Sequence, residues 1–130
     1  MTFLLDSNVF IYFLNDDLTE EGNLLFEQAI ASGGAYSLIS RLEVLGYPLS
    51  PSQRQDAEEM LQLFQELPID DVIINQAIAL RSSIRIKSID ALIASTALLH
   101  ELPLITRNIK DFEAIAGLNL IDPFQPPAQS

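Results

Sequence analysis

The chain contains no cysteine and only one histidine among its 130 residues. The lack of cysteine excludes a disulfide-stapled secreted scaffold and a thiolate metal site. The apolar runs, such as residues 91–94, are far too short to cross a bilayer, and no basic segment precedes the apolar start as it does in a signal peptide. We therefore expect a soluble protein of the cytoplasm that has no membrane partner.

Basic residues are also scarce. Seven lysines and arginines stand against eighteen aspartates and glutamates, which gives a formal net charge of −11 at pH 7. This balance argues against binding of a nucleic acid through a broad basic face. A local contact stays open, because some of the acids can belong to a metal site instead of the surface.

The chain is rich in the apolar residues that a core requires. Hydrophobic residues make up 48% of the sequence and charged residues 19%, which excludes a disordered chain. A domain of this size buries roughly two-thirds of its unfolded surface and needs no disulfide or zinc to fold. We expect one domain over residues 1–125 and a loose tail at residues 126–130.

Short apolar runs alternate with longer stretches of helical period. We expect strands at residues 3–5, 35–39, 68–70, 103–106 and 118–121. We expect helices at residues 9–14, 19–32, 40–48, 52–67, 71–84, 88–101 and 109–116. This alternation predicts an α/β fold with a central, mostly parallel β-sheet flanked by α-helices.

Acidic residues occur where such a fold binds ligands, beyond the carboxyl ends of its strands. Asp6 directly follows the first strand, and Asp111 follows the fourth. Glu43 and Asp90 fall in the first turns of two predicted helices. If these ends open on one edge of the sheet, the four carboxylates converge.

Each acid also has a purely structural interpretation. Ser40 and Glu43 have the spacing of a helix capping box, and Asp90 is favoured by the helix dipole. Asp6 can cap the helix that follows it, and Asp111 can be an ordinary surface acid. Asp6 and Asp90 are the hardest to explain in this way, because both interrupt apolar sequence.

Gathered carboxylates repel one another unless a cation lies among them. Two unit charges about 4 Å apart repel by about 1 kcal/mol in water and by about 4 kcal/mol at an effective dielectric of 20. Such a cluster therefore predicts raised pKa values or a bound divalent cation. With no cysteine and one histidine the donors are oxygens, which suit Mg²⁺ or Mn²⁺ and the hydrolysis of a phosphodiester by a metal-activated water.

Three blocks of sequence carry a resemblance to a known family. They are Leu-Leu-Asp-Ser-Asn-Val at residues 4–9, Ser-Arg-Leu-Glu-Val-Leu-Gly at residues 40–46, and a C-terminal block at residues 88–97 and 104–112. In order and spacing the chain resembles a PIN domain of the VapC-type branch, the toxins of bacterial toxin–antitoxin pairs. Residues 49–86 match the family poorly.

The resemblance implies a metal-dependent endoribonuclease that cuts single-stranded or loop RNA. Asp6, Glu43 and Asp90 match the family's acidic metal positions, and Asp111 is the better candidate for the fourth because Asn108 replaces the alternative carboxylate. Glu43 completes the metal site or acts as base toward the attacking water. The resemblance also implies a homodimer and a cognate antitoxin protein as partners.

Substrate contacts are expected from residues beside the acids. Ser7 is expected to support Asp6 or to contact a phosphate, and Asn108 to contact metal-bound water or phosphate. Five of the seven basic residues lie between positions 81 and 110, among them Arg107 and Lys110, which flank Asn108. We expect these cations to rim the acidic pocket and hold the RNA backbone, with a helix-end role left open for Arg81 and Arg85.

Three other interpretations of the sequence compete with this one. A phosphohydrolase of the haloacid dehalogenase type requires Asp-x-Asp, and here position 8 is Asn. A phosphoreceiver domain requires an acidic pair before Asp6 and a lysine at a set place after the last strands, and the sequence has no acidic pair before Asp6 and no lysine in that place. A catalytically inactive PIN-like module that binds proteins is the alternative that stays open.

Overall fold

The first strand, β1 (Leu4–Leu5), lies at the centre of the sheet in the computed structural model, which describes residues 2–125. Both leucine side chains are fully buried. Successive side chains of a strand point to opposite faces, so Leu5 packs with the core of one face and Leu4 with the core of the other. Both positions are apolar because helices cover both faces of a parallel sheet.

Five short strands form one sheet in the order β3-β2-β1-β4-β5, and all neighbouring strands are parallel. The elements follow one another as β1, α1 (Ser7–Leu14), α2 (Glu20–Ala31), β2 (Ala35–Ser37), α3 (Leu38–Leu45), α4 (Pro51–Leu61), β3 (Gln65–Leu67), α5 (Asp71–Ser83), α6 (Ser88–Leu99), β4 (Leu104–Ile105), α7 (Ile109–Phe112) and β5 (Leu120–Ile121). The predicted α/β class with a parallel sheet is confirmed.

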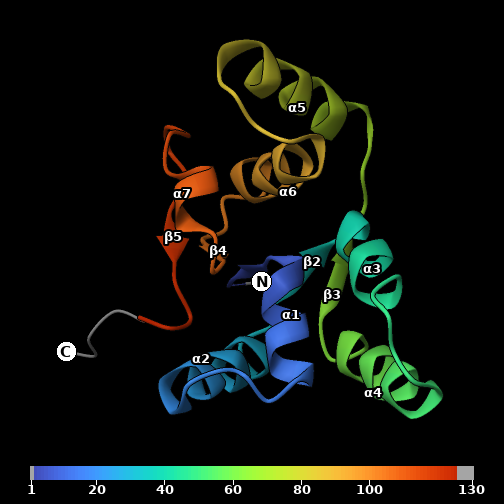
Figure 1. Ribbon diagram of the computed structural model, residues 1–130. Coiled ribbons are helices and arrows are strands. Elements are labelled where there is room, and N and C mark those ends of the chain that lie inside the picture. The colour runs from blue at the N-terminus through green and yellow to red at the C-terminus, as the bar shows by residue number, and fades with distance from the viewer. Residues whose placement is uncertain (1, 126–130) are drawn as a thin grey trace.

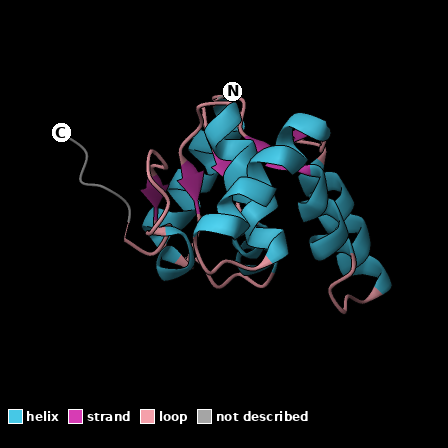
Figure 2. Ribbon diagram, turned by 90° about the horizontal axis from the view of Figure 1, so that it is seen from above, coloured by secondary structure: helices cyan, strands magenta, loops and turns pink. Residues whose placement is uncertain are grey.

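The helices form two layers around the sheet. Helices α1, α2 and α4 lie on one side in Figure 1, and α5, α6 and α7 lie on the other. Figure 2 shows the strands as short arrows among the helices. The first layer packs around Phe10, whose buried ring meets those of Phe26, Tyr36 and Phe64 edge-on at centroid distances of 5.9, 5.7 and 5.1 Å. This aromatic cluster anchors α1, and with it the residues that follow β1.

The middle of the chain departs from the predicted elements. The helix expected at 52–67 ends at Leu61, and the strand expected at 68–70 lies instead at Gln65–Leu67. These three residues pair with Ala35–Ser37, and Leu67 becomes buried. The gain of a strand ladder and of core contacts overrides the helical period that continues through Phe64.

The start of α3 also differs from the prediction. The strand expected at 35–39 stops at Ser37, and the helix begins at Leu38 instead of Ser40. Ser37 caps this helix by accepting a hydrogen bond from the Ile39 N–H at 3.3 Å. The predicted capping box of Ser40 and Glu43 is therefore wrong, and Ser40 lies inside the helix.

Smaller corrections apply at other helix ends. Helix α1 begins at Ser7, not at Val9, and its cap is Asp6. Helix α7 ends at Phe112, well before the predicted end at 116. Helix α2 ends as expected before Gly33, whose φ of 87° a residue with a side chain rarely adopts.

Among residues 2–125, no helix combines the length and the apolar character needed to cross a membrane. The tail predicted at 126–130 lies outside the described residues.

Candidate active site

The site lies at the topological switch point of the sheet, where the strand order reverses. From β1 the chain moves to β2 on one side, and β4 returns to pair with β1 on the other. In open parallel sheets, the loops at such a switch point diverge beyond the carboxyl ends of the strands and leave a crevice. Asp6 follows β1 there, and Thr106 and Asn108 follow β4.

Asp6 is buried between these two strand ends, with only 4% of its surface exposed. Its Oδ1 accepts a hydrogen bond from the Ser7 N–H at 2.8 Å, and its Oδ2 accepts one from the Thr106 hydroxyl at 2.8 Å. The carboxylate therefore caps α1 and also ties α1 to the end of β4. Both oxygens are held in fixed positions by groups of the protein itself.

The position of Asp6 disfavours its negative charge. Burial raises the pKa of Asp6 to about 6 from 3.8, although the hydrogen bonds from Thr106 and Ser7 lower it and the charges of Asp90 and Glu43 raise it further. A carboxyl that is buried, aligned and close to other acids is typical of functional sites.

Asp90 lies in the first turn of α6 and is half-buried. Burial raises its pKa, and the charge of Asp111 raises it further. Glu43 acts in the same direction, whereas Lys87 lowers the pKa of Asp90. Asp90 therefore lies within electrostatic reach of both Asp111, on α7, and Glu43, on α3.

Glu43 lies on α3, on the side of the site opposite Asp90. The Ser7 hydroxyl lies 2.6 Å from Glu43 Oε1 and 2.8 Å from Ser40 Oγ. These contacts join α1 to α3 and fix the Glu43 carboxylate beside Asp6. The structure thus bonds the Ser7 side chain, predicted to contact substrate, to other protein groups.

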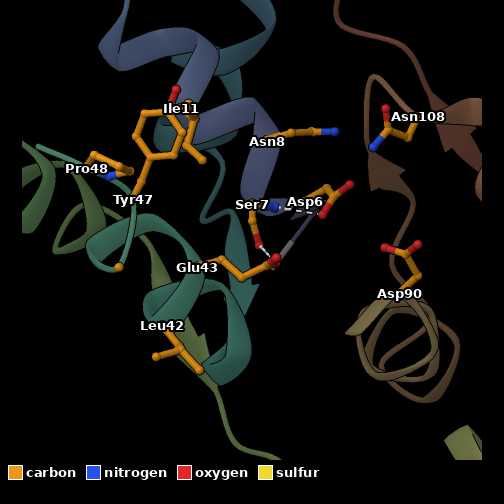
Figure 3. A pocket seen from close by; sticks show the side chains of 11 residues that line it. Asp6, Ser7, Asn8, Ile11, Leu42, Glu43, Tyr47, Pro48, Asp90 and Asn108 are labelled. Atoms are coloured by element: carbon orange, nitrogen blue, oxygen red, sulfur yellow. Dashed lines mark hydrogen bonds between the residues drawn. The ribbon is translucent and has the colours of Figure 1, made fainter. Parts of the chain in front are cut away.

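A cavity of about 530 Å³ opens between these walls. Figure 3 shows Asp6, Ser7 and Glu43 on the side formed by α1 and α3, with Asp90 and Asn108 across the opening. A second cavity of about 430 Å³ shares Glu43, Asp90 and Asn108 with the first and adds Asp111. All four predicted acids therefore line two adjoining hollows.

The donor set suits a hard divalent cation, because every candidate ligand is an oxygen. Within residues 2–125, however, no three histidine, aspartate or glutamate side chains are gathered closely enough to hold a metal ion. Mg²⁺ usually keeps several waters and binds through one or two carboxylates. The buried Asp6 and the raised pKa values of Asp6 and Asp90 fit such an ion, which would relieve their repulsion.

The predicted basic rim is only partly present. Arg107 forms an ion pair with Asp122 at 3.2 Å, and its guanidinium carbon lies 4.3 Å from the centre of the Phe124 ring. Lys110 is exposed on α7 and lines neither hollow. Lys87 does line the second hollow, beside Asp90. Arg81 donates to the Ser88 hydroxyl and links the end of α5 to the start of α6.

Two supporting residues were missed in the sequence. Thr106 bonds Asp6, and the signal for it is a hydroxyl that directly follows a buried apolar strand. Tyr47 lines the hollow that contains Asp6, with 42% of its surface exposed. No periodicity separates Tyr47 from a core aromatic, because it lies in the turn after α3.

The raised pKa of Asp6 predicts a dependence of stability on pH. The folded state binds this proton more tightly than the unfolded state, so its stabilising effect is present below about pH 4 and is lost as the pH rises through about 6. In metal-free buffer, the free energy of unfolding of the wild type should fall relative to that of Asp6→Asn by about 2 kcal/mol between pH 4 and 7.5. Urea unfolding followed by circular dichroism measures this difference.

The matched control is Asp56→Asn, which removes an exposed carboxylate from α4. Its stability relative to the wild type should stay within about 0.5 kcal/mol over the same range. A difference between Asp6→Asn and the wild type that does not change with pH would contradict the assignment of Asp6 as a buried, strained carboxyl.

Comparisons with known proteins agree with this geometry. A toxin–antitoxin complex from Klebsiella pneumoniae contains a chain that is 32% identical, with a TM-score of 0.77, over 95% of this chain and 99% of that one. FitAcB from Neisseria gonorrhoeae is 25% identical with a TM-score of 0.79, over 95% and 99% of the two chains. DNA-bound VapBC from Salmonella typhimurium, 22% identical over 95% and 98%, has a TM-score of 0.83 and shows the likeness of the fold.

No match was found among curated proteins. The family model of the PIN domain matches residues 3–118, which include Asp6, Glu43, Asp90 and Asp111. With most of its length matched by that model, the chain belongs to the PIN domain family.

Proposed function

We propose that this chain is a metal-dependent endoribonuclease that cuts single-stranded or loop RNA and acts as the toxin of a toxin–antitoxin pair. One observation carries the proposal: Asp6 is buried and fixed by two hydrogen bonds, with Glu43 on the same wall and Asp90 across an open hollow. A purely structural cap would not need Glu43 and Asp90 nearby, because their charges raise its pKa.

Asp6, Glu43, Asp90 and Asp111 are the residues that would hold Mg²⁺ or Mn²⁺. When bound, such an ion supplies an activated water and stabilises the charge that develops on a phosphodiester. The chain provides the alignment: Asp6 is fixed by Ser7 and Thr106, and Glu43 by Ser7. Glu43, which Ser7 holds at the wall of the hollow, would accept the proton of the attacking water.

The RNA contact should be small and local. The second hollow is lined by Glu43, Asp90 and Asp111, and Lys87 is a cation that lines it beside Asn108. Tyr47 offers a partly exposed ring for a splayed base, as in the recognition of single-stranded RNA. Arg107 is held by Asp122 and Phe124, so it reaches a phosphate only after that pair opens. Lys110 remains available on the surface of α7.

The antitoxin and a second copy of the chain are the proposed partners. Three of the similar structures are described as a toxin–antitoxin complex or as VapBC or FitAcB assemblies. On this chain, a hollow of about 590 Å³ between α3 and the start of α4 is lined by apolar Leu38, Leu42 and Leu45. Helix α5 exposes further apolar side chains, including Val72 and Ile78. Such surfaces favour partner proteins.

Cleavage of RNA tests the activity directly. Purified protein with Mg²⁺ should cut a loop-containing RNA, and Asp6→Asn should lower the rate by at least about a hundredfold, because it removes a charged metal ligand. EDTA should abolish cleavage by the wild type, and Mn²⁺ should restore it. The measurement is the initial rate of product formation on a gel.

The control is Asp56→Asn, which should cleave at the wild-type rate. Cleavage that survives both EDTA and Asp6→Asn would contradict the metal mechanism. Failure of the wild type to cut any RNA, while it still binds a partner protein, would favour the inactive binding module.

The repulsion between the acids makes a separate prediction for Asp90→Asn. In EDTA this variant should be as stable as the wild type or more stable, because the charge beside Asp111 and Glu43 is removed. Mg²⁺ at ten times its dissociation constant should stabilise the wild type by about 1.4 kcal/mol and the variant much less. Thermal unfolding with and without Mg²⁺ measures both effects.

Asp71→Asn is the matched control, because it removes an exposed acid from the first turn of another helix, α5. It should lose only the dipole interaction, and its response to Mg²⁺ should equal that of the wild type. If Asp90→Asn unfolds markedly more easily than the wild type in EDTA, Asp90 serves the helix and not the site.

A further inference from the structure

The hydroxyl of Ser40 differs from three other hydroxyls that lie inside helices. Ser82, Ser83 and Thr96 each donate to the carbonyl four residues earlier, at 2.8–2.9 Å, which is the usual bond of a hydroxyl inside a helix. Ser40 is fully buried in α3, and its hydroxyl instead meets Ser7 of α1 at 2.8 Å. The hydrogen bond of this hydroxyl therefore joins two residues that are 33 apart in the sequence, and not two residues of the same helix.

The Ser7 hydroxyl is the donor in both of its side-chain contacts. The Ser7 hydroxyl has one proton, and it lies close to two oxygens, those of Ser40 and Glu43. A carboxylate can only accept, and the Ser7–Glu43 distance of 2.6 Å is that of a charge-assisted bond. The Ser7 hydroxyl is therefore placed to donate to Glu43 and to Ser40, with Glu43 the closer and stronger acceptor, and Ser40 holds the Ser7 oxygen at 2.8 Å. The Ser7 hydroxyl thus joins the buried Ser40 side chain to the Glu43 carboxylate.

The side chains of Ser40, Ser7 and Glu43 lie on the side of the site that α1 and α3 form. Ser40 and Glu43 lie one turn apart on α3, so they share a face of the helix. Ser7 directly follows Asp6, and its backbone N–H donates to the Asp6 carboxylate. One residue of α1 thus orients two of the four acids, and Ser40 fixes the orientation of that residue.

We propose that Ser40 is a positioning residue for Glu43: through the Ser7 hydroxyl it holds the Glu43 carboxylate toward the cation that the site takes up. The inference rests on the proposed function. It also assigns the Ser7 hydroxyl to Glu43 instead of to a substrate phosphate. Residues that orient metal ligands in this way typically change metal affinity or activity by about 10- to 100-fold when they are removed.

The first experiment tests the hydrogen-bond chain without metal. Unfolding equilibria of the full chain are measured in EDTA for the wild type, Ser40→Ala, Glu43→Ala and the double variant. The two substitutions should be non-additive by at least about threefold in the unfolding constant, because the groups share Ser7. The control cycle uses Ser95→Ala, which removes an equally buried hydroxyl that has no hydrogen-bond partner within residues 2–125. That cycle should be additive.

The second experiment measures the effect on the site. Calorimetry with Mn²⁺ alone should show about tenfold weaker binding for Ser40→Ala than for the wild type, and wild-type affinity for Ser95→Ala. In RNA cleavage, Ser40→Ala should lower kcat by about tenfold and leave KM within about twofold, because the RNA contacts are intact. A merely structural serine would change neither Mn²⁺ affinity nor kcat.

The outcomes distinguish a failure of the role of Ser40 from a failure of the proposed function. An additive cycle, or wild-type Mn²⁺ affinity and kcat in Ser40→Ala, overturns the role of Ser40 while the wild type still binds Mn²⁺ and cleaves RNA. A wild type that neither binds Mn²⁺ nor cleaves RNA overturns the proposed function and this inference with it.

Discussion

The repulsion among carboxylates held at the carboxyl edge of a buried sheet is the interaction on which the rest of the structure depends. Asp6 follows β1 at the topological switch point of the sheet. The charges of Glu43 and Asp90, which lie on other elements, both raise its pKa. Burial and these charges keep the pKa of Asp6 near 6, which costs stability at neutral pH. A fold retains such a cost when the strained groups serve a function.

Other parts of the molecule hold this strained arrangement in place. The ring of Phe10 packs edge-on against three aromatic rings and anchors α1, which carries Ser7. Thr106 ties Asp6 to the end of β4, and Ser7 ties Glu43 to the same helix. Leu4 and Leu5 bury both faces of the central strand, so Asp6 has little freedom to move toward water. The two hydrophobic cores thus keep the Asp6 carboxylate away from water.

The sequence was sufficient for the fold class and for the positions of Asp6, Asp90 and Asp111, because each of these acids lies at the border of an apolar or periodic run. Glu43 was expected in the first turn of its helix, but it lies near the end of α3. Prediction from the sequence failed where tertiary contacts determine the element boundaries or the partner of a side chain. Gln65–Leu67 continues a helical period but forms an edge strand, since pairing with β2 buries Leu67. Ser40 has the spacing of a cap but lies inside α3, where its partner is Ser7, far away in the chain. Arg107 was expected at a phosphate, and its pairing with Asp122 depends on how β5 returns beside β4.

The central prediction is that a divalent cation binds between Asp6 and Asp90. The most direct test is a crystal structure of the protein grown with Mn²⁺, in which anomalous scattering locates the ion. The account predicts one or more anomalous peaks inside the hollow, in contact with the Asp6 carboxylate and within reach of Asp90. An empty hollow at saturating Mn²⁺, or peaks confined to other surface acids, would contradict it.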